Sequence, residues 1–443
     1  MIVIIGGGPA GRFAAIRLGN AGKEVTLVER GAIGGQCLNH GCMAVCALND
    51  AARTVARARQ FAGAGIFKDE PMIDFPSLLA GMEGVQAKIR AVLDHETRGA
   101  GVEIRYGSTA RICGRQVFID GDEVEAEAVI VATGSVPAIP EVEGTDLAGV
   151  FTAHTLPRMH DLPRDLVIVG GGIAAAEFAY IFKQLGSTVT VLARSVFLKD
   201  IDPRLRKLAL KELAGVEIRE NAPLTRITGT GHADGAAYGG ETPGECPADA
   251  VLLAAGLVPN TSMVSGVATG PKGEIVTDDR MQTSVPGVYA AGDVTGGPYL
   301  TPVARLQGIV AAENILGHEM RYAPSVVPQS ISLANDLAFA LAEDDEGVEL
   351  SVPAPAGPGS FWSVPGGDTG LGKVLVDPEN GEIRGVWAAS PGAGIIATYM
   401  AEAIRHRRTV DDFRDLIEVH PLADGVHGLI PAAADLLKKR KRE

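Results

Sequence analysis

The sequence lacks most of the features that would place it in a membrane, on a nucleic acid or in a disulfide-rich scaffold. Its 443 residues include only five cysteines, carry a formal net charge of -14, and contain no apolar run near the ~18 residues that span a membrane. The N-terminal MIVIIGGG resembles no secretory signal. A nucleic-acid surface needs a basic stripe. We therefore expect a cytoplasmic protein with no nucleic-acid or membrane partner, and we expect the final basic run KKRKRE to be a solvated tail.

Three of the five cysteines, Cys37, Cys42 and Cys46, fall within ten residues of one another. A secreted disulfide scaffold spreads an even number of cysteines over a short chain, so this spacing favours a reducing compartment. A bond between Cys37 and Cys42 would then be catalytic rather than structural. A zinc site would need about four ligands, and two thiols with His40 do not complete one, so no metal is expected. Inert burial of the thiols is the remaining alternative.

The N-terminal segment predicts a dinucleotide-binding unit. An apolar strand over residues 2–5 is followed by GGGPAG, a helical pattern and a second strand, EVTLVE. Gly6, Gly8 and Gly11 therefore lie between strand and helix, where they permit a tight turn and close approach of a pyrophosphate. Glu29 follows Gly6 by 23 residues, about where an acid binds a ribose hydroxyl.

The same pattern recurs in LVIVGGGIAAAEFAYIFKQLGSTVTVLARS, with Gly170, Gly172 and Ala175 in the three turn positions. Two such units predict two dinucleotides. The same offset of 23 residues from Gly170 reaches Ala193, and Arg194 follows it. Without the acid, and with Arg194 and Lys199 able to pair with a 2'-phosphate, the second unit favours NADPH over NADH. A surface basic pair with no ligand is the alternative.

Three further apolar stretches end in glycine and turn residues: 128–140, 249–260 and 287–297. Each fits a strand that delivers a loop to a ligand. Residues 323–443 contain no glycine turn of this kind and include one helical run, AGIIATYMAEAIRHRR. The predicted fold class is α/β, with two Rossmann-like dinucleotide-binding domains and a C-terminal α+β domain.

Together these stretches resemble the two-dinucleotide-binding flavoprotein disulfide reductases, which include glutathione reductase, dihydrolipoamide dehydrogenase and mercuric reductase. GGGPAG with Glu29 resembles their FAD turn, and GGQCLNHGC resembles their active-site GGTCLNVGC. VIVATGSVP, GVYAAGDV and LTPVARLQG are similar to their next motifs, in the same order, and TVLARS resembles mercuric reductase. The resemblance covers essentially the whole chain.

The resemblance implies FAD and NADPH as cofactors, with NADH less favoured. It also implies a homodimer with an FAD domain formed by residues 1–149 and 261–322, an NAD(P)H domain over 150–260 and a dimerisation domain over 323–443. The implied cofactor-binding residues are Gly6, Gly8, Pro9, Ala10, Gly11, Glu29, Arg30, Gly35, Gln36, Ala110, Ala132, Thr133, Gly134, Gly170, Gly172, Ile173, Ala174, Glu177, Arg194, Lys199, Gly256, Gly292, Asp293, Thr301, Pro302 and Val303.

The resemblance also implies an enzyme and a route for electrons. NADPH reduces the flavin, and the flavin reduces a disulfide between Cys37 and Cys42. Cys42 is the thiol beside the flavin, and Cys37 attacks a low-molecular-weight disulfide substrate. His420 matches the catalytic histidine, which acts as acid and base in the active site of the neighbouring subunit.

Some positions depart from the family pattern. Gly425 stands where a glutamate usually orients the histidine, and Cys46 stands where a lysine usually pairs with the acid at Glu177. We expect Cys46 to be a packed free thiol, because thiols one helical turn apart are too distant for an undistorted disulfide. Two alternatives remain open: a flavoenzyme that reduces a quinone, a metal ion or oxygen, and a subunit that passes electrons to a partner protein.

Overall fold

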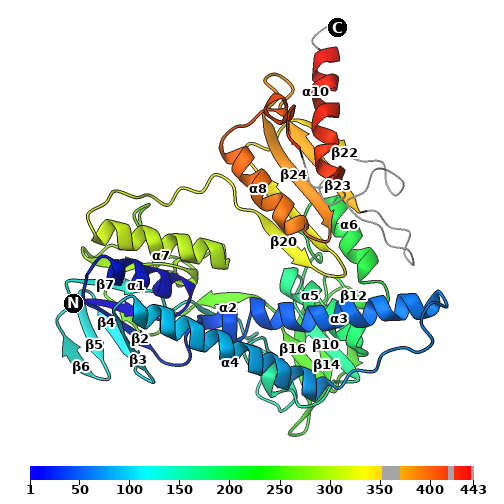
Figure 1. Cartoon of the computed structure of the whole chain (residues 1–443). Coiled ribbons are helices and arrows are strands. Elements are labelled where there is room, and N and C mark those ends of the chain that lie inside the picture. The colour runs from blue at the N-terminus through cyan, green and yellow to red at the C-terminus, as the bar shows by residue number, and fades with distance from the viewer. Residues whose placement is uncertain (352–369, 418–423, 441–443) are drawn as a thin grey trace.

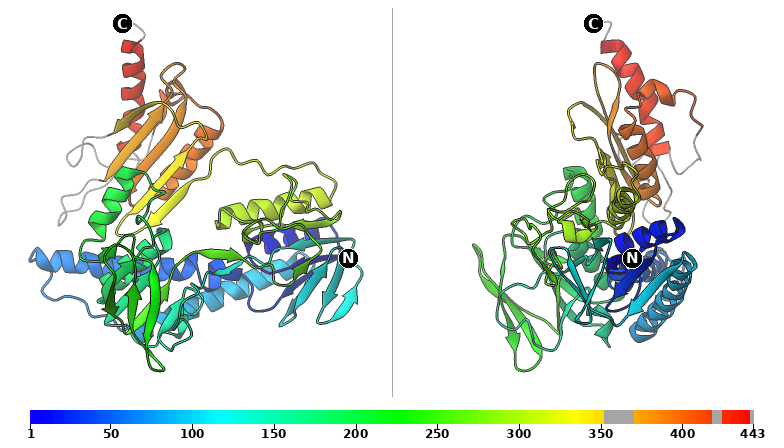
Figure 2. Two further views of the ribbon diagram at one scale, coloured as in Figure 1. Left: turned by 180° about the vertical axis from the view of Figure 1, so that it is seen from behind. Right: turned by 90° about the vertical axis from the view of Figure 1, so that its left-hand side faces the viewer.

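The computed structural model describes residues 1–351, 370–417 and 424–440. Figure 1 shows two α/β units side by side, joined by long helices, with a third unit packed above one of them. The views in Figure 2 place the N-terminus in the first unit and the final helix at the outer end of the third.

The first unit contains a five-stranded parallel sheet in the order β19-β7-β1-β2-β3. Its strands are β1 (Ile2–Ile5), β2 (Val25–Glu29), β3 (Val102–Tyr106), β7 (Ala128–Val131) and β19 (Val288–Ala290). The run IVII is buried at every position, as expected for a parallel strand that is covered on both faces. Two distant chain segments build this sheet, because β19 pairs with β7.

Helices α1 (Pro9–Asn20) and α7 (Thr301–Ile315) pack together against this sheet, so closely that a Cβ on Gly308 would lie 2.2 Å from the Ala10 carbonyl oxygen. The short α2 (Gly35–Asn39) leads into α3 (Cys42–Gly63), and α4 (Phe75–Gly99) returns to β3. Smaller strands complete the unit: β4 (Ala110–Cys113), β5 (Gln116–Ile119), β6 (Asp122–Val124), β8 (Ser135–Pro137), β17 (Leu257–Pro259) and β18 (Val264–Ser265).

The second unit repeats the design with a parallel sheet in the order β12-β11-β10-β16-β9. Its strands are β9 (Val150–Thr152), β10 (Asp165–Val169), β11 (Thr188–Leu192), β12 (Glu217–Arg219) and β16 (Ala250–Leu253). Its helices are α5 (Ile173–Leu185) and α6 (Pro203–Glu212). A separate antiparallel sheet contains β13 (Leu224–Gly229), β14 (Ala233–Tyr238) and β15 (Gly244–Pro247).

The third unit is an antiparallel sheet with helices on one face, in the order β20-β21-β24-β23-β22. Its elements are β20 (Gln329–Ser332), β21 (Asp336–Leu341), β22 (Val348–Ser351), β23 (Leu371–Val376), β24 (Ile383–Ser390), α8 (Ala393–Arg405), α9 (Asp424–His427) and α10 (Leu429–Arg440). Part of the basic run is helical, since Lys438 and Lys439 lie in the last turn of α10. Their side chains are exposed, so the helix continues through them while the charges stay in solvent.

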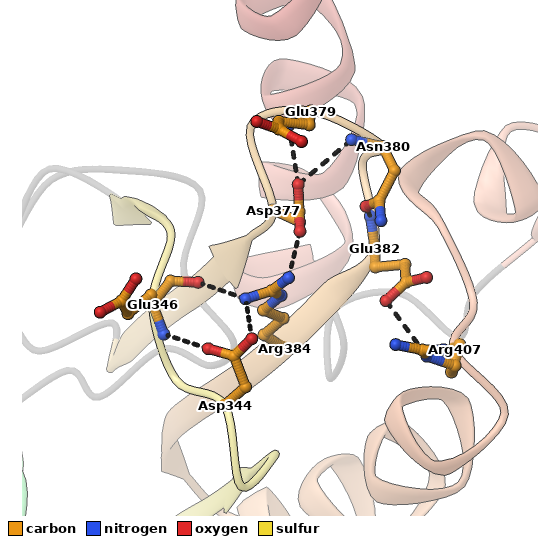
Figure 3. Close-up of polar contacts among 8 residues, drawn as sticks. All are labelled: Asp344, Glu346, Asp377, Glu379, Asn380, Glu382, Arg384 and Arg407. Atoms are coloured by element: carbon orange, nitrogen blue, oxygen red, sulfur yellow. Dashed lines mark hydrogen bonds and ion pairs between the residues drawn. The ribbon is translucent and has the colours of Figure 1, made fainter.

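A network of charged residues fixes the hairpin between β23 and β24 (Figure 3). The Arg384 guanidinium donates to Asp344, to the Glu346 carbonyl oxygen and to Asp377. The second oxygen of Asp377 accepts from the backbone N–H groups of Glu379 and Asn380, at 2.7 and 3.1 Å. One carboxylate therefore caps the turn and orients the arginine, which stabilises the strand ends.

The third unit is tied to the second by a buried lysine. Lys373 in β23 is 2% exposed, and its Nζ lies 2.9 Å from a carboxylate oxygen of Asp202 and of Glu349. The same ammonium lies 3.7 Å from the centre of the Trp387 ring. Because Asp202 also caps α6, this contact positions α6 against the C-terminal sheet. Within the described residues, no helix is long and apolar enough to cross a membrane.

Candidate active site

The first glycine turn follows β1 and is held too tightly for side chains. A Cβ on Gly6 would lie 2.3 Å from the Ala132 carbonyl oxygen, and a Cβ on Gly11 would lie 2.0 Å from the Gly6 carbonyl oxygen. Gly6 also has φ +106°, which favours glycine. Gly8 is the N-cap of α1 and Pro9 its first residue, which suits a helix start whose N–H groups face a ligand.

The Glu29 carboxylate lies against this turn. One oxygen accepts from the Gly7 N–H at 2.7 Å, and the other accepts from the Gly31 N–H at 2.6 Å. The acid is thus fixed where β2 ends, beside the exposed Arg30. A Cβ on Gly35 would lie 2.7 Å from the Gly8 Cα, so the backbones of these two glycines are in contact beside the turn. The glycines and the fixed acid fit a dinucleotide such as FAD.

A second group of predicted residues lies where β7, β19 and α7 meet. Ala132, Thr133 and Gly134 follow β7, and Thr301, Pro302 and Val303 open α7. The Ser135 hydroxyl donates to the Asp293 carboxylate at 2.6 Å, and burial raises the pKa of Asp293. The Gly292 N–H donates to Gln307 at 2.7 Å. Ser135 and Gln307 were not predicted as site residues, although both lie in stretches that resemble the family, because the spacing within a motif does not identify a partner in another motif.

The two thiols of the predicted redox pair lie next to each other. Cys37 lies in α2 and Cys42 is the first residue of α3. The pKa of Cys42 is lowered to about 6, chiefly because the Cys37 thiol donates a hydrogen bond to it, with a further contribution from Thr301. The same hydrogen bond raises the pKa of Cys37. The hydrogen bond thus favours the negative charge on Cys42 over Cys37 when the pair loses a proton.

Glu177 from α5 and Cys46 from α3 lie beside this pair. One Glu177 oxygen accepts from the Ser332 N–H at 2.9 Å, and burial raises the Glu177 pKa to about 7. Cys46 is a free thiol, as predicted, but its side chain is exposed rather than packed. The expectation of packing fails because Cys46 is on the side of α3 that faces away from the helix core residues Ala44 and Leu48.

A histidine pair lies beside the thiols and was not predicted. The rings of His40 and His154 have centroids 4.8 Å apart, and His154 Nε2 lies 2.9 Å from the Gln36 side-chain oxygen. Burial lowers the pKa of both rings, that of His154 to about 4, so both are neutral at pH 7. His154 lies 118 residues from Gln36, and no sequence signal connects the two. The described residues contain no group of three or more His, Cys, Asp or Glu side chains placed to hold a metal ion.

The second glycine turn follows β10 and precedes α5. A Cβ on Gly170 would lie 2.3 Å from the Ala254 carbonyl oxygen, whereas a Cβ on Gly172 would meet nothing within 4 Å. Ile173 and Ala174 begin α5 beside this open space. After β11, Arg194 and Lys199 are both exposed, and neither has an ion-pair partner among the described residues. Exposed, unpaired cations next to an open glycine turn fit a dinucleotide that carries a phosphate.

The remaining predicted residues are less central. Gly256 has φ +109° and its carbonyl oxygen accepts from Ala138 N–H at 2.9 Å, which connects β16 to β8. Ala110 begins β4, and its buried side chain belongs to the cluster that also contains Ile5 and Val28. The predicted catalytic residue His420 lies outside the described residues.

A family model described as pyridine nucleotide-disulphide oxidoreductase matches residues 1–308. The chain belongs to this family. Mercuric reductase from Shigella flexneri is 31% identical and covers 100% of this chain and 81% of its own length. Dihydrolipoyl dehydrogenase from Thermus scotoductus is 32% identical over 99% of this chain and 97% of its own. Both identities extend beyond the matched family region into the third unit.

Solved structures share the fold of this oxidoreductase. LpdA from Mycobacterium tuberculosis superposes with a TM-score of 0.86 at 25% identity, over 98% of this chain and 99% of its own. The HOCl-induced flavoprotein disulfide reductase RclA from Escherichia coli gives 0.84 at 24%, over 99% of each chain. The predicted family and fold class are confirmed. The oxidoreductase is an enzyme of an FAD-dependent family that uses a pyridine nucleotide.

Proposed function

We propose that this oxidoreductase passes electrons from NADPH through FAD and the Cys37–Cys42 pair to a low-molecular-weight disulfide. The observation that carries the proposal is the placement of the two thiols, Cys37 in α2 and Cys42 at the first position of α3, with the Cys42 sulfur 3.7 Å from the hydroxyl of Thr301 at the start of α7. When bound, FAD supplies a carrier that accepts a hydride and returns two electrons to a disulfide. Glu29, Asp293 and the first glycine turn are the residues that would hold it.

The protonation of the pair assigns different tasks to the two thiols. Cys37 keeps its proton while Cys42 is ionised, so a base must remove the Cys37 proton before its sulfur can attack a substrate. His40 and His154 are neutral, but each is partly buried and His154 is bonded to Gln36. We therefore assign the base to His420 of the partner subunit in a homodimer, as the family pattern implies.

The disulfide exchange is balanced in atoms and electrons. Cys37 attacks one sulfur of the substrate, forms a mixed disulfide and releases one thiol. Cys42 then attacks the Cys37 sulfur, the second thiol leaves, and the bond between Cys37 and Cys42 is restored. The hydride from NADPH supplies two electrons, and its proton together with one from solvent accounts for the two thiols.

The preference for NADPH rests on the loop after β11. Arg194 and Lys199 are exposed and unpaired among the described residues, and no acid stands where Glu29 stands in the first unit. A guanidinium can bind a 2'-phosphate through two hydrogen bonds. We further propose that residues 1–149 and 261–322 form the FAD domain, 150–260 the NADPH domain, and 323–443 the dimerisation domain.

The decisive experiment is an anaerobic titration of the holoenzyme with NADPH, followed by absorbance. We expect a long-wavelength thiolate-to-flavin band after about two electrons, which Cys42→Ser abolishes. The band should decline as the pH falls through about 6, because protonation removes the Cys42 thiolate. Cys113→Ser, at an exposed cysteine in β4, is the matched control and should keep both the band and turnover.

A second set of assays separates the alternatives. Cys37→Ser should abolish turnover of small disulfides in a panel screen. Turnover of a quinone, a metal ion or oxygen that survives Cys37→Ser would contradict the proposal and favour a flavoenzyme that bypasses the thiols. Stoichiometric co-purification of a second protein, with no turnover of any small disulfide, would favour an electron-transfer subunit.

A further inference from the structure

A groove of about 760 Å³ lies where the three units meet, away from the thiols. Its walls come from α3 of the first unit, α5 and α6 of the second, and the turn between β20 and β21 of the third. Figure 1 shows α3 extending from the first unit across the second. The groove uses the middle and end of α3 and the later turns of α5, whereas Cys42 and Glu177 belong to the earlier turns.

The lining of the groove is cationic, although the chain as a whole is acidic. The lining contains five basic side chains and two acidic ones, and these are Arg53, Arg57, Arg59, Lys183, Lys211, Asp50 and Glu212. In a chain with a net charge of -14, such a concentration of positive charge favours the binding of an anion in the groove.

Two of the five basic side chains already have an acidic or carbonyl partner, and two others have no ion pair in the described part of the chain. Arg53 pairs with Asp336 at 2.8 Å, and Arg59 donates to the Gln184 carbonyl oxygen at 2.6 Å. For Arg57 and Lys183, no carboxylate lies within ion-pair distance in the described part of the chain. Burial and the neighbouring Arg59 lower the pKa of Lys183, and a bound anion would offset both effects by stabilising the charged ammonium.

One of the two acids of the groove, Glu212, is hydrogen-bonded to the third unit. Glu212 accepts from the Asn335 side-chain amide at 2.9 Å and from the Asn335 backbone N–H at 3.4 Å. Burial raises the Glu212 pKa. In the described part of the chain, Glu212 forms no ion pair with Arg57.

A buried hydroxyl at the groove has no partner. Tyr180 is 1% exposed, and its hydroxyl makes no hydrogen bond within the described chain. Its charged neighbours are Glu212, Arg53 and Arg57, so the hydroxyl points toward the cationic lining. Buried polar atoms are nearly always hydrogen-bonded, and an unpaired donor beside unpaired cations indicates a site for an acceptor.

We propose that this groove binds a small polyanion of the class of phosphorylated or polycarboxylate metabolites. Arg57 and Lys183 pair with its charges, and the Tyr180 hydroxyl donates to one of its oxygens. Such a ligand bridges α3 and α5. These helices also carry Cys42 and Glu177, in turns nearer their N-termini.

The test uses the FAD-loaded enzyme with saturating NADP⁺, so that Arg194 and Lys199 are occupied. Pyrophosphate and citrate are the probes, and calorimetry and thermal unfolding are the measurements. We expect saturable binding and a rise in Tm with at least one probe. Arg57→Glu and Lys183→Glu should abolish it, and Tyr180→Phe should weaken it about tenfold.

The matched control is Lys207→Glu, an exposed lysine of α6 outside the groove, which should leave binding unchanged. Arg57→Gln provides a milder variant if charge reversal disturbs folding, and it should still weaken binding. No saturable binding at millimolar probe, or equal losses in Arg57→Glu and Lys207→Glu, would overturn the proposal. The binding readout needs no disulfide turnover, so its failure is distinct from failure of the proposed function.

Discussion

The two dinucleotide units share one backbone plan and differ in the residues at the end of the second strand. In the first unit, both oxygens of Glu29 are bonded to the backbone of the glycine turn. In the second unit, Ala193 is buried at that place, and Arg194 projects without an ion-pair partner in the described chain. The fixed acid of the first unit therefore fits an uncharged ribose, and the exposed cations of the second unit fit the proposed ligand with a 2'-phosphate.

The turns also differ in how closely they are packed. The third turn position is Gly11 in the first unit and Ala175 in the second. The Gly11 Cα approaches the Gly6 carbonyl so closely that no methyl group fits, while the second unit already accommodates one. The backbone of the first turn therefore requires glycine at the third position, whereas the second turn accepts alanine there. The features that distinguish the second unit are its exposed side chains.

Gly11→Ala should produce the largest effect, because Gly11 has the closest backbone contact of the glycines in the two turns. The added Cβ would lie 2.0 Å from the Gly6 carbonyl oxygen and 3.2 Å from the Ala132 Cβ. Alanine is the better helix former, so any loss must come from this overlap. We expect a loss of about 2 to 4 kcal/mol in the free energy of unfolding and loss of bound FAD. Chemical denaturation and the flavin-to-protein absorbance ratio measure both.

Gly172→Ala, at the second position of the second turn, is the control for adding a methyl group to a glycine in open space. Its Cβ would meet no atom of the protein within 4 Å, so stability should change by less than about 0.5 kcal/mol. The methyl group would instead face the nucleotide and raise the KM for NADPH. If Gly11→Ala retained FAD and full stability, the contrast between a packed and an open turn would be wrong.

Arg194→Glu should produce the next largest effect and should be confined to the second unit. The carboxylate would repel a 2'-phosphate and could accept a ribose hydroxyl, as Glu29 does in the predicted FAD site. We expect kcat/KM for NADPH to fall about 10- to 100-fold while that for NADH changes little. FAD content should not change. Equal losses with both nucleotides would show that Arg194 has no role in choosing between them.

The sequence predicts the features that short-range spacing can specify. The glycine turns, Glu29 and Arg194 follow from local backbone and charge requirements, and the structure places each at the end of a parallel strand. Contacts between segments that are distant in the chain produce no short-range spacing in the sequence, so they cannot be predicted in this way. The Ser135–Asp293 bond joins residues 158 positions apart, and the His40–His154 pair and the cationic groove depend on how whole elements pack. Cys46 was assigned correctly as free and wrongly as packed, because helical spacing alone does not say which face is covered.

Cys46→Lys should produce the smallest effect, at the junction of the two units. Glu177, on α5 of the second unit, has a pKa of about 7 in the fold and an ordinary value near 4.5 when unfolded. The folded state therefore binds the extra proton between these values, and stability should fall as the pH rises through this window. A lysine on α3 would offer Glu177 a cation and lower its pKa. We expect the loss of stability from pH 5 to pH 7.5 to shrink by about 1 to 2 kcal/mol.

Urea denaturation of the holoenzyme across this pH range measures the change, with Glu177→Gln as the reference that cannot ionise and Cys46→Ser as the control for losing the thiol. Cys46→Ser should keep the wild-type pH dependence, and Glu177→Gln should lose only the part that Glu177 contributes, since His40, His154 and Cys42 still titrate. A profile for Cys46→Lys identical to that of Cys46→Ser would mean that position 46 does not interact with Glu177. The charge at this junction would then be set by burial, by the Ser332 N–H and by other groups of α3 such as Cys42 and Arg53.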